Sequence, residues 1–264
     1  MVEYLEFAKK IARHAGAIMR EYFQQEEMGL EFKSDRTPVT IADKMINSYL
    51  IEQVKQEYPL FGVQGEEEKY HPEREYLWVC DPIDGTSQFT RKVPVSMFSL
   101  ALVKDGEVLV GVTYDPFLDE MYTAIKGEGA YCNGNKIHVN QKQFGELGCS
   151  VNYSMWDKAK YDTLEIVKII RTMSKTCQVG STVHASMLVA CGRTSAEIFP
   201  GTSHGNCDIS ASKLIVEEAG GKVTNFHGND QRYDQDIDGA VLSNGVIHEE
   251  LLQIILDLEQ KGLL

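Results

Sequence analysis

The order of hydrophobic patterns along the chain restricts the fold more than any other feature of this sequence. Two helical patterns come first, over residues 3–25 and 40–57, with apolar side chains three and four positions apart. Apolar β-type runs separated by turn signals then follow, at 77–80, 95–103, 108–114 and 120–124. We therefore expect two helices beside a set of neighbouring antiparallel strands.

The second part of the chain alternates between helical and apolar β-type segments. Helical patterns cover 157–173, 182–192, 208–219 and 246–261. Short apolar runs lie between them, near 149–152, 195–199, 221–224 and 239–243. This alternation predicts helices over a sheet. The chain is thus expected to form two α/β lobes, residues 1–145 and 146–264, that share one compact body.

The charge of the chain excludes several classes of partner. Lys and Arg number 26 against 39 Asp and Glu, which gives a net charge of −13. This excess disfavours direct contact with nucleic acid or an anionic membrane surface. No apolar run approaches the ~18 residues of a membrane helix, and charged side chains interrupt the first 22 residues, unlike a signal peptide. An anionic substrate would therefore need something cationic in the site.

The cysteines indicate a reduced compartment. The chain has six, none in a two-residue spacing and none with matching histidine pairs, which excludes zinc ribbons and thioredoxin-like sites. Cys80 and Cys191 lie inside apolar runs and are expected to be buried free thiols. We expect a cytoplasmic location.

A serine hydrolase is one alternative. Gly201-Thr202-Ser203-His204-Gly205 has the spacing of a G-x-S-x-G nucleophile elbow, with Asp234 or Asp238 and His248 following in the order of such enzymes. However, Pro200 precedes the motif, and only about 60 residues remain for the rest of an α/β-hydrolase. A loop rich in Gly and Ser is the better interpretation.

Two acidic segments carry the main chemical signal, Gly65-Glu66-Glu67-Glu68 and Asp81-Pro82-Ile83-Asp84-Gly85-Thr86. Asp81 and Asp84 come where an apolar run ends, the place at which open α/β folds put their sites. With Glu66 they would form an all-oxygen cluster, which suits magnesium, manganese or calcium. Such carboxylates repel one another, so a cation would stabilise them.

The residues that follow Asp84 favour a phosphate site. Gly85 allows a ligand close to the backbone, and Thr86 and Ser87 could present free N–H groups at the start of a helical turn. Two metal ions about 3.5–4 Å apart can activate a water and stabilise a leaving oxygen in phosphoryl transfer. The segment therefore points to metal-dependent phosphate chemistry.

The sequence resembles the magnesium-dependent, lithium-sensitive phosphatases that include inositol monophosphatase, fructose-1,6-bisphosphatase and the adenosine-bisphosphate phosphatases. The resemblance covers nearly the whole chain. It rests on the family's G-E-E, D-P-I-D-G-T-x-x-F and Asp…E-A-G-G motifs, which correspond here to 65–67, 81–89, and Asp208 with 218–221. It implies a layered α-β-α-β-α sandwich of mixed α+β and α/β character, a homodimer, and a small phosphorylated substrate.

The resemblance also implies metal ligands. Glu66, Asp81 and the Ile83 carbonyl would hold a first Mg²⁺, and Asp81, Asp84 and Asp208 a second. A third, weaker ion would hold the attacking water, and Mn²⁺ could replace Mg²⁺. The N-terminal lobe would thus supply most ligands, and the C-terminal lobe Asp208 and the loops of the substrate pocket.

Catalytic roles follow from the same resemblance. Glu66 and Thr86 would orient the attacking water, and Thr86 would be tied to Asp43, which ends Val39-Thr40-Ile41-Ala42-Asp43. The backbone N–H groups of Gly85 and Thr86 would bind the phosphate. Lys33 and Asp35 would lie on a mobile loop near the third ion.

The substrate pocket is where the sequence departs from the family. Asp84, Gly85, Thr86, Gly180, Thr182 and Asp208 are the expected substrate contacts, but Gly201 holds the position of the glutamate that binds a substrate hydroxyl in inositol monophosphatases. Glu197 is the predicted substitute. The family's W-D-x-A-A-G is here Cys207-Asp208-Ile209-Ser210-Ala211-Ser212, so its tryptophan and small-residue packing are not expected.

Two hypotheses of different class follow. The first is a phosphomonoesterase that hydrolyses a small polyol or sugar phosphate, inositol monophosphate first; fructose-1,6-bisphosphatase, histidinol-phosphatase and adenosine 3′,5′-bisphosphate phosphatase are alternatives. The sequence shows no basic cluster near the site, which favours a monophosphate. The second is a binding protein of the transcription machinery, as some family members are.

Overall fold

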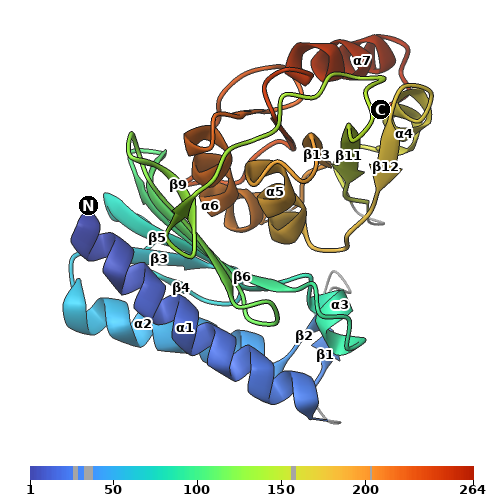
Figure 1. Ribbon diagram of the computed structural model, residues 1–264. Coiled ribbons are helices and arrows are strands. Elements are labelled where there is room, and N and C mark those ends of the chain that lie inside the picture. The colour runs from blue at the N-terminus through green and yellow to red at the C-terminus, as the bar shows by residue number, and fades with distance from the viewer. Residues whose placement is uncertain (26–28, 33–37, 156–158, 203) are drawn as a thin grey trace.

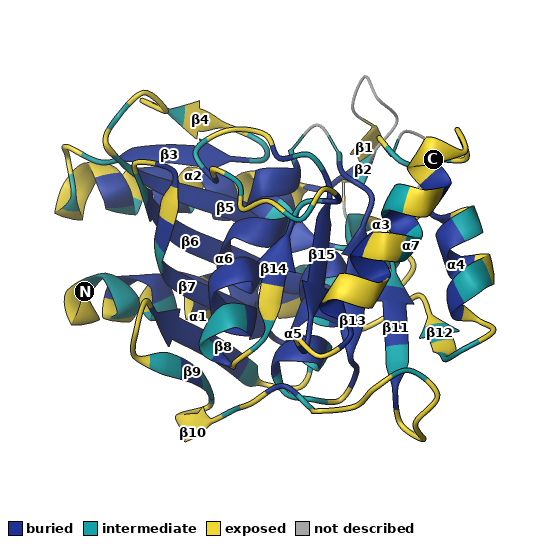
Figure 2. Ribbon diagram, turned by 90° about the horizontal axis from the view of Figure 1, so that it is seen from above, coloured by how far each residue is buried: buried dark blue, intermediate teal, exposed yellow. Residues whose placement is uncertain are grey.

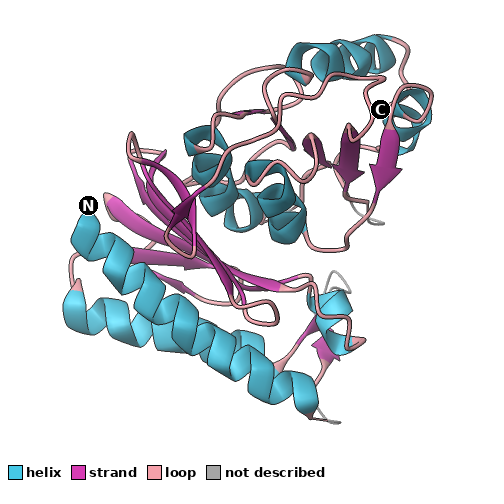
Figure 3. Cartoon of the chain, in the orientation of Figure 1, coloured by secondary structure: helices cyan, strands magenta, loops and turns pink. Residues whose placement is uncertain are grey.

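The chain folds into five layers, helix, sheet, helix, sheet and helix (Figure 1). The computed structural model describes residues 1–25, 29–32, 38–155, 159–202 and 204–264. The predicted α-β-α-β-α sandwich is confirmed. Figure 3 shows how the helices alternate with the two sheets.

The first layer contains the two predicted helices, α1 (Val2–Gln24) and α2 (Ile41–Glu57). In α1, Phe7, Ile11 and Ile18 are buried at helical spacing, so one face packs on the sheet. A capping box begins α2: the Thr40 side chain accepts from the N3 backbone, and the Asp43 carboxylate accepts from the Thr40 N–H. This cap at Thr40 therefore fixes the residue at which α2 begins.

The large sheet has eight strands in the order β10-β9-β8-β7-β6-β5-β3-β4. Neighbours are antiparallel except β3 and β5, which are parallel. The strands are β3 (Gly62–Gly65), β4 (Lys69–Tyr70), β5 (Tyr76–Asp84), β6 (Met97–Lys104), β7 (Glu107–Asp115), β8 (Glu120–Ile125), β9 (Gly129–Cys132) and β10 (Asn135–Lys136). Each predicted run of this part corresponds to one of these strands, which confirms the antiparallel set.

Both faces of this sheet are buried, as Figure 2 shows for its central strands. In β5, Trp78 and Cys80 pack on the side of α1 and α2, whereas Leu77 and Val79 pack on the opposite side. This explains why residues 77–80 form a continuous apolar run without polar alternation.

The central layer is the helix pair α5 (Thr182–Ala190) and α6 (Gly205–Glu218). In α6, Ser210, Ala211 and Ser212 are fully buried, and Gly111 of β7 is so near that a Cβ there would lie 3.0 Å from the Ala211 carbonyl oxygen. The sequence of this motif led us to expect that the family's close packing of small residues would be missing here. The structure retains that packing. Ala211 keeps the alanine of the family motif at this close contact, and the serines lie on either side of it.

A five-stranded sheet and two outer helices complete the fold. The strand order is β12-β11-β13-β15-β14, with β11 (Ser150–Tyr153), β12 (Lys175–Cys177), β13 (Ala196–Phe199), β14 (Lys222–Thr224) and β15 (Ala240–Ser243). Helices α4 (Leu164–Ile170) and α7 (His248–Gln260) share an apolar cluster with β11, β13 and β15. This layer therefore closes the sandwich.

The structure also contains elements that the sequence patterns did not predict. These are the short strands β1 (Glu31–Phe32), β2 (Pro38–Val39), β3, β4, β9, β10 and β12. The helical turn expected at Thr86 is present as α3 (Thr86–Thr90). Helix α4 is shorter than the predicted 157–173, and α6 begins three residues before the predicted 208. The lobe boundary near 145 falls between β10 and β11 and remains a prediction. No helix in the described ranges is long and apolar enough to span a membrane.

Candidate active site

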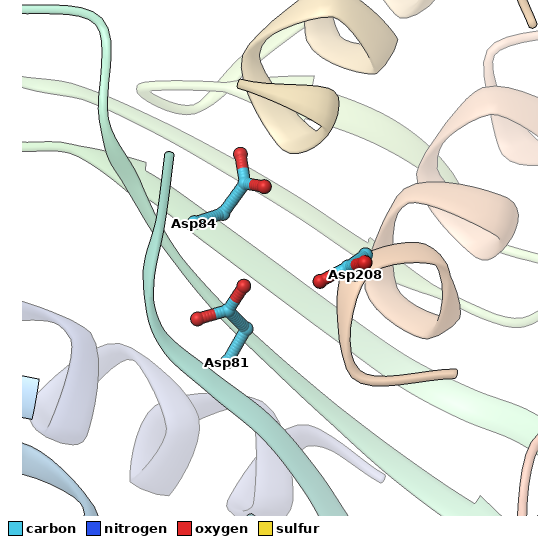
Figure 4. A group of neighbouring side chains, drawn as sticks. All are labelled: Asp81, Asp84 and Asp208. Carbon is cyan, nitrogen blue, oxygen red and sulfur yellow. The ribbon is translucent and has the colours of Figure 1, made fainter. Parts of the chain in front are cut away.

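Three aspartates from distant parts of the chain meet between the large sheet and the central helices. Asp81 and Asp84 belong to β5, and Asp208 lies in the first turn of α6. One carboxylate oxygen of each lies within 4.8 Å of the others, and Figure 4 shows the three side chains converging. No other group of this kind among His, Cys, Asp and Glu occurs in the part of the chain that the structure describes.

A β-bulge brings Asp81 and Asp84 together. Asp81 pairs with Ser99 of β6 and Asp84 pairs with Met97, so β5 has one extra residue over this stretch. Without it, side chains three positions apart in a strand would point to opposite faces. The Ile83 N–H donates to Asp81 Oδ1 over 2.9 Å. The predicted turn is thus a bulge within a strand that continues to Asp84.

Asp84 is held by the N-terminus of α5. The Ser181 hydroxyl donates to Asp84 Oδ2, and the N–H groups of Val183 and Thr182 donate over 2.9 and 3.3 Å. The helix dipole favours a negative charge at this end. Burial raises the pKa of Asp84 to about 6, although these hydrogen bonds act to lower it.

Burial also raises the pKa of Asp81 well above its usual range, and the charges of Glu66 and Asp208 add to the effect. The crowding of carboxylates is thus a second cause of the raised pKa. A divalent cation would offset both the burial of the negative charge and the repulsion between the carboxylates. An all-oxygen donor set suits Mg²⁺, Mn²⁺ or Ca²⁺. The donor chemistry therefore fits the ion that the resemblance implies.

Glu66 reaches the site from the neighbouring strand. It follows β3, whose Gly65 lies opposite Cys80 in the parallel pair with β5. The Glu66 N–H donates to the Cys80 carbonyl over 3.1 Å. Glu66 therefore lies beside Asp81 and lines the same pocket.

Asn47 of α2 fixes the acidic turn, a role that motif spacing did not reveal. Its Oδ1 accepts from the N–H groups of Glu67 and Glu68, each over 3.3 Å, and its Nδ2 donates to the Glu68 carbonyl over 3.1 Å. A Cβ on Gly65 would lie 2.0 Å from Asn47 Oδ1, so this contact requires glycine. The sequence signal was an asparagine on the apolar face of a helix, where it is normally disfavoured.

Thr86 and Asp43 are not joined by the hydrogen bond that the resemblance implies. Thr86 Oγ1 donates to the Ile83 carbonyl over 2.9 Å, and Asp43 Oδ2 accepts from the N–H and the hydroxyl of Thr40 over 2.8 and 2.5 Å. Asp43 Oδ1 is buried without a hydrogen-bond partner. Since a carbonyl oxygen has two lone pairs, Ile83 could still bind a cation.

Two glycines let the segments around residues 85 and 180 approach each other at the site. Gly85 and Gly180 have φ of +80° and +88°, where other residues are strained. A Cβ on Gly85 would lie 3.0 Å from the Gly180 carbonyl oxygen, and a Cβ on Gly180 would lie 2.5 Å from Gln88 Nε2. Gly85, Gly180 and Thr182 all line the pocket.

Glu197, the predicted substitute for the hydroxyl-binding glutamate, is placed differently. It is fully buried in β13, and its carboxyl accepts from Ser154 Oγ over 2.7 Å. Burial raises its pKa well above the usual range. Ser154 and Thr182 line the pocket, whereas Glu197 is not among the lining residues. Glu197 therefore supports the pocket wall from behind.

The pocket has a volume of about 500 Å³, suited to a small ligand. Several lining residues were not predicted for this site, because they come from separate segments without a shared motif: Pro38, Gln88, Arg91, Ser154, Met155 and Gln178. Thr202 and His204, which the sequence placed only in the G-x-S-x-G segment, also line the pocket. The predicted loop residues Lys33 and Asp35 lie outside the described residues.

The serine-hydrolase alternative lacks its base. His248 is buried, its Nδ1 is 2.8 Å from Ser243 Oγ, and its Nε2 is 2.9 Å from Thr224 Oγ1. Both ring nitrogens therefore already have hydroxyl partners, Ser243 and Thr224. Ser203 lies outside the described residues.

Comparison with known proteins agrees with this geometry. The sequence profile of the inositol monophosphatase family matches residues 1–260. The chain is 32% identical over 225 residues to the Nus factor SuhB of Xylella fastidiosa, which covers 84% of this chain and 81% of that protein. It is 31% identical over 240 residues to inositol monophosphatase 1 of Mus musculus, covering 86% and 84%.

The fold comparison gives the same family. The structure of the IMPase from Thermotoga maritima superposes with a TM-score of 0.87 at 27% identity. The superposition covers 98% of this chain and 99% of that one. The layered arrangement is thus shared over the full length of both chains.

Proposed function

The chain belongs to the inositol monophosphatase family and is a phosphomonoesterase, and on this premise we propose that it hydrolyses a small polyol or sugar phosphate with the aid of Mg²⁺. Inositol monophosphate is the first candidate. The observation that carries the proposal is the convergence of Asp81, Asp84 and Asp208 in the pocket that Glu66 also lines. Fructose 1,6-bisphosphate, histidinol phosphate and adenosine 3′,5′-bisphosphate are the alternative substrates.

In this proposal the metal ligands are Glu66, Asp81, the Ile83 carbonyl, Asp84 and Asp208. When bound, two or three divalent ions would activate a water and neutralise the phosphoryl charge. The protein holds the ligands rigidly, because Asp81 and Asp84 lie in a bulged central strand and Asp208 on a buried helix. Attack would occur directly on phosphorus, without a phospho-enzyme.

The chain's own groups would orient the reactants. Glu66 and Thr86 would position the attacking water, and the N–H groups of Gly85 and Thr86 would bind the phosphate. Asp84, Thr182 and the backbone at Gly180 would receive the leaving alcohol. Such positioning accounts for much of the catalysis in phosphoryl transfer.

Metal binding can be tested without turnover. Mg²⁺ or Mn²⁺ at about 100 times its dissociation constant should add about 3 kcal/mol to the free energy of unfolding. For a chain of this size that raises the melting temperature by roughly 5–10 °C. Asp208→Asn and Asp84→Asn should lose this shift. Asp257→Asn, which changes an exposed carboxylate on α7, should keep it. An unchanged shift in both site variants would refute the assigned ligands.

Substrate choice can be tested by phosphate release with Mg²⁺ or chelator, each with and without lithium. We expect release from inositol 1-phosphate that requires Mg²⁺ and disappears in Asp84→Asn. Release by folded, metal-loaded protein from none of the four candidate esters would refute the proposal. A clear preference for another ester would replace inositol monophosphate.

A role in binding the transcription machinery is the second candidate, supported by the similarity to the Nus factor SuhB. Pull-down with purified RNA polymerase tests it. A stoichiometric complex that survives Asp84→Asn would favour this role. We further propose a homodimer, which light scattering measures, and a cytoplasmic location.

A further inference from the structure

A strong cation lies in the pocket wall. Arg91 is the only Lys or Arg among the described residues that line the pocket. It follows directly after α3, the short helix that begins at Thr86, beside the proposed phosphate-binding backbone of Gly85. In a protein with a net charge of −13, a cation at this place is a specific feature.

Arg91 is available for a ligand. Its side chain is exposed, and no ion pair joins it to any described residue. The next residue, Lys92, contrasts with it: its Nζ donates to the carbonyls of Phe23 and Gln25 at the end of α1, and it does not line the pocket. Of the two neighbouring cations, Lys92 is thus used by the fold, and Arg91 is not.

The rest of the wall favours a neutral or anionic leaving group. Apart from the proposed metal ligands, no Asp or Glu occurs among the described lining residues, because Glu197 lies behind Ser154. Gln88 and Gln178 add amide groups. A cationic leaving group would therefore find no carboxylate outside the metal site, whereas an anion would find Arg91.

We propose that Arg91 binds a second phosphate on the leaving alcohol, so that the site accepts sugar bisphosphates in preference to the matching monophosphates. This inference rests on the proposed function. Arg91 comes directly after the short helix α3, which begins at Thr86, so the proposed phosphate-binding backbone and this guanidinium belong to one short segment at the pocket. The guanidinium fork suits a phosphate in two-point contact.

The test compares fructose 1,6-bisphosphate with fructose 1-phosphate, which lacks the phosphate on C6. Arg91→Gln should raise KM for the bisphosphate about tenfold more than for the monophosphate, the loss expected for one charge-assisted hydrogen bond at an exposed site. The value of kcat should change little, because this contact is present in both ground and transition states. Arg91→Lys should recover part of the preference.

Lys92→Gln is the matched control, since it removes the same charge one residue away, outside the pocket. It should keep the bisphosphate preference. Equal loss on both sugars in Arg91→Gln, or a wild-type enzyme without bisphosphate preference, would overturn the inference while leaving the phosphatase activity in place. Failure to hydrolyse inositol 1-phosphate and every other ester would instead refute the proposed function.

Discussion

Asp43 should make the protein less stable as the pH rises. The residue is fully buried, and burial raises the pKa of its carboxyl from 3.8 to about 7 against the opposing effect of its hydrogen bonds with Thr40. Between these pH values the folded protein binds more protons than the unfolded chain, so the free energy of unfolding falls with increasing pH. A difference of about 3 pH units corresponds to about 4 kcal/mol.

Asp43→Asn keeps the side-chain shape and an acceptor for Thr40, but it cannot ionise. Its amide leaves a buried donor where Oδ1 has no partner, at a cost of about 1–3 kcal/mol at any pH. We therefore compare the free energy of unfolding of the variant with that of wild type at two pH values. This difference should shift in favour of the variant by about 4 kcal/mol between a pH well below both pKa values and a pH well above them.

Urea unfolding followed by circular dichroism, in chelator at acidic and alkaline pH, measures this change. Since the constant cost of the amide cancels, the comparison isolates the ionisation of one carboxyl. Asp257→Asn on the exposed side of α7 is the control and should show no such pH dependence. A pH-independent difference for Asp43→Asn would show that this carboxyl is ionised in the folded protein and would refute the reasoning.

Three further outcomes are expected. Gly65→Ala should lower the free energy of unfolding by about 1–3 kcal/mol in thermal unfolding and reduce activity, because its Cβ would displace Asn47. Wild-type stability and activity in this variant would contradict the role of Asn47 in holding the acidic turn. Burial lowers the pKa of His248 to about 4, so stability present above pH 6.5 should decline by about 3 kcal/mol as the pH falls to 4, and His248→Asn should show a shallower decline in urea titrations. Glu197→Gln should keep KM for inositol 1-phosphate within about twofold, since Ser154 separates this group from the pocket; a tenfold increase would make it a substrate contact.

Local periodicity predicted the elements that carry their own signal. Helix α1 has a clear apolar stripe, and β5 to β8 are apolar runs between turns, so their positions needed no tertiary information. Strand β3 reads Gly-Val-Gln-Gly and has weak strand propensity. It is a strand because it pairs with β5 under the cover of α2, and a contact between distant segments leaves no local pattern.

The site shows the same limit. The two acidic segments, with Glu66 in one and Asp81 and Asp84 at the end of an apolar run in the other, predicted an acidic cluster. The sequence could not predict how each side chain points. The bulge in β5 determines that Asp81 and Asp84 share one side. Glu197 is enclosed because all four residues of β13 are buried.

The position of Asp208 shows how packing holds charges together. Its neighbours Cys207 and Ile209 are fully buried in the apolar cluster between α6 and the large sheet, which fixes the backbone from which Asp208 projects. Close packing of small residues of α6 on Gly111 then fixes the distance of that backbone from β5 and its neighbours. Apolar burial thus keeps three mutually repelling carboxylates within 4.8 Å, even though the raised pKa of Asp81 shows that their proximity opposes ionisation. Because the ligands are held before any cation arrives, metal binding needs no rearrangement of the fold, and its free energy can appear directly as added stability.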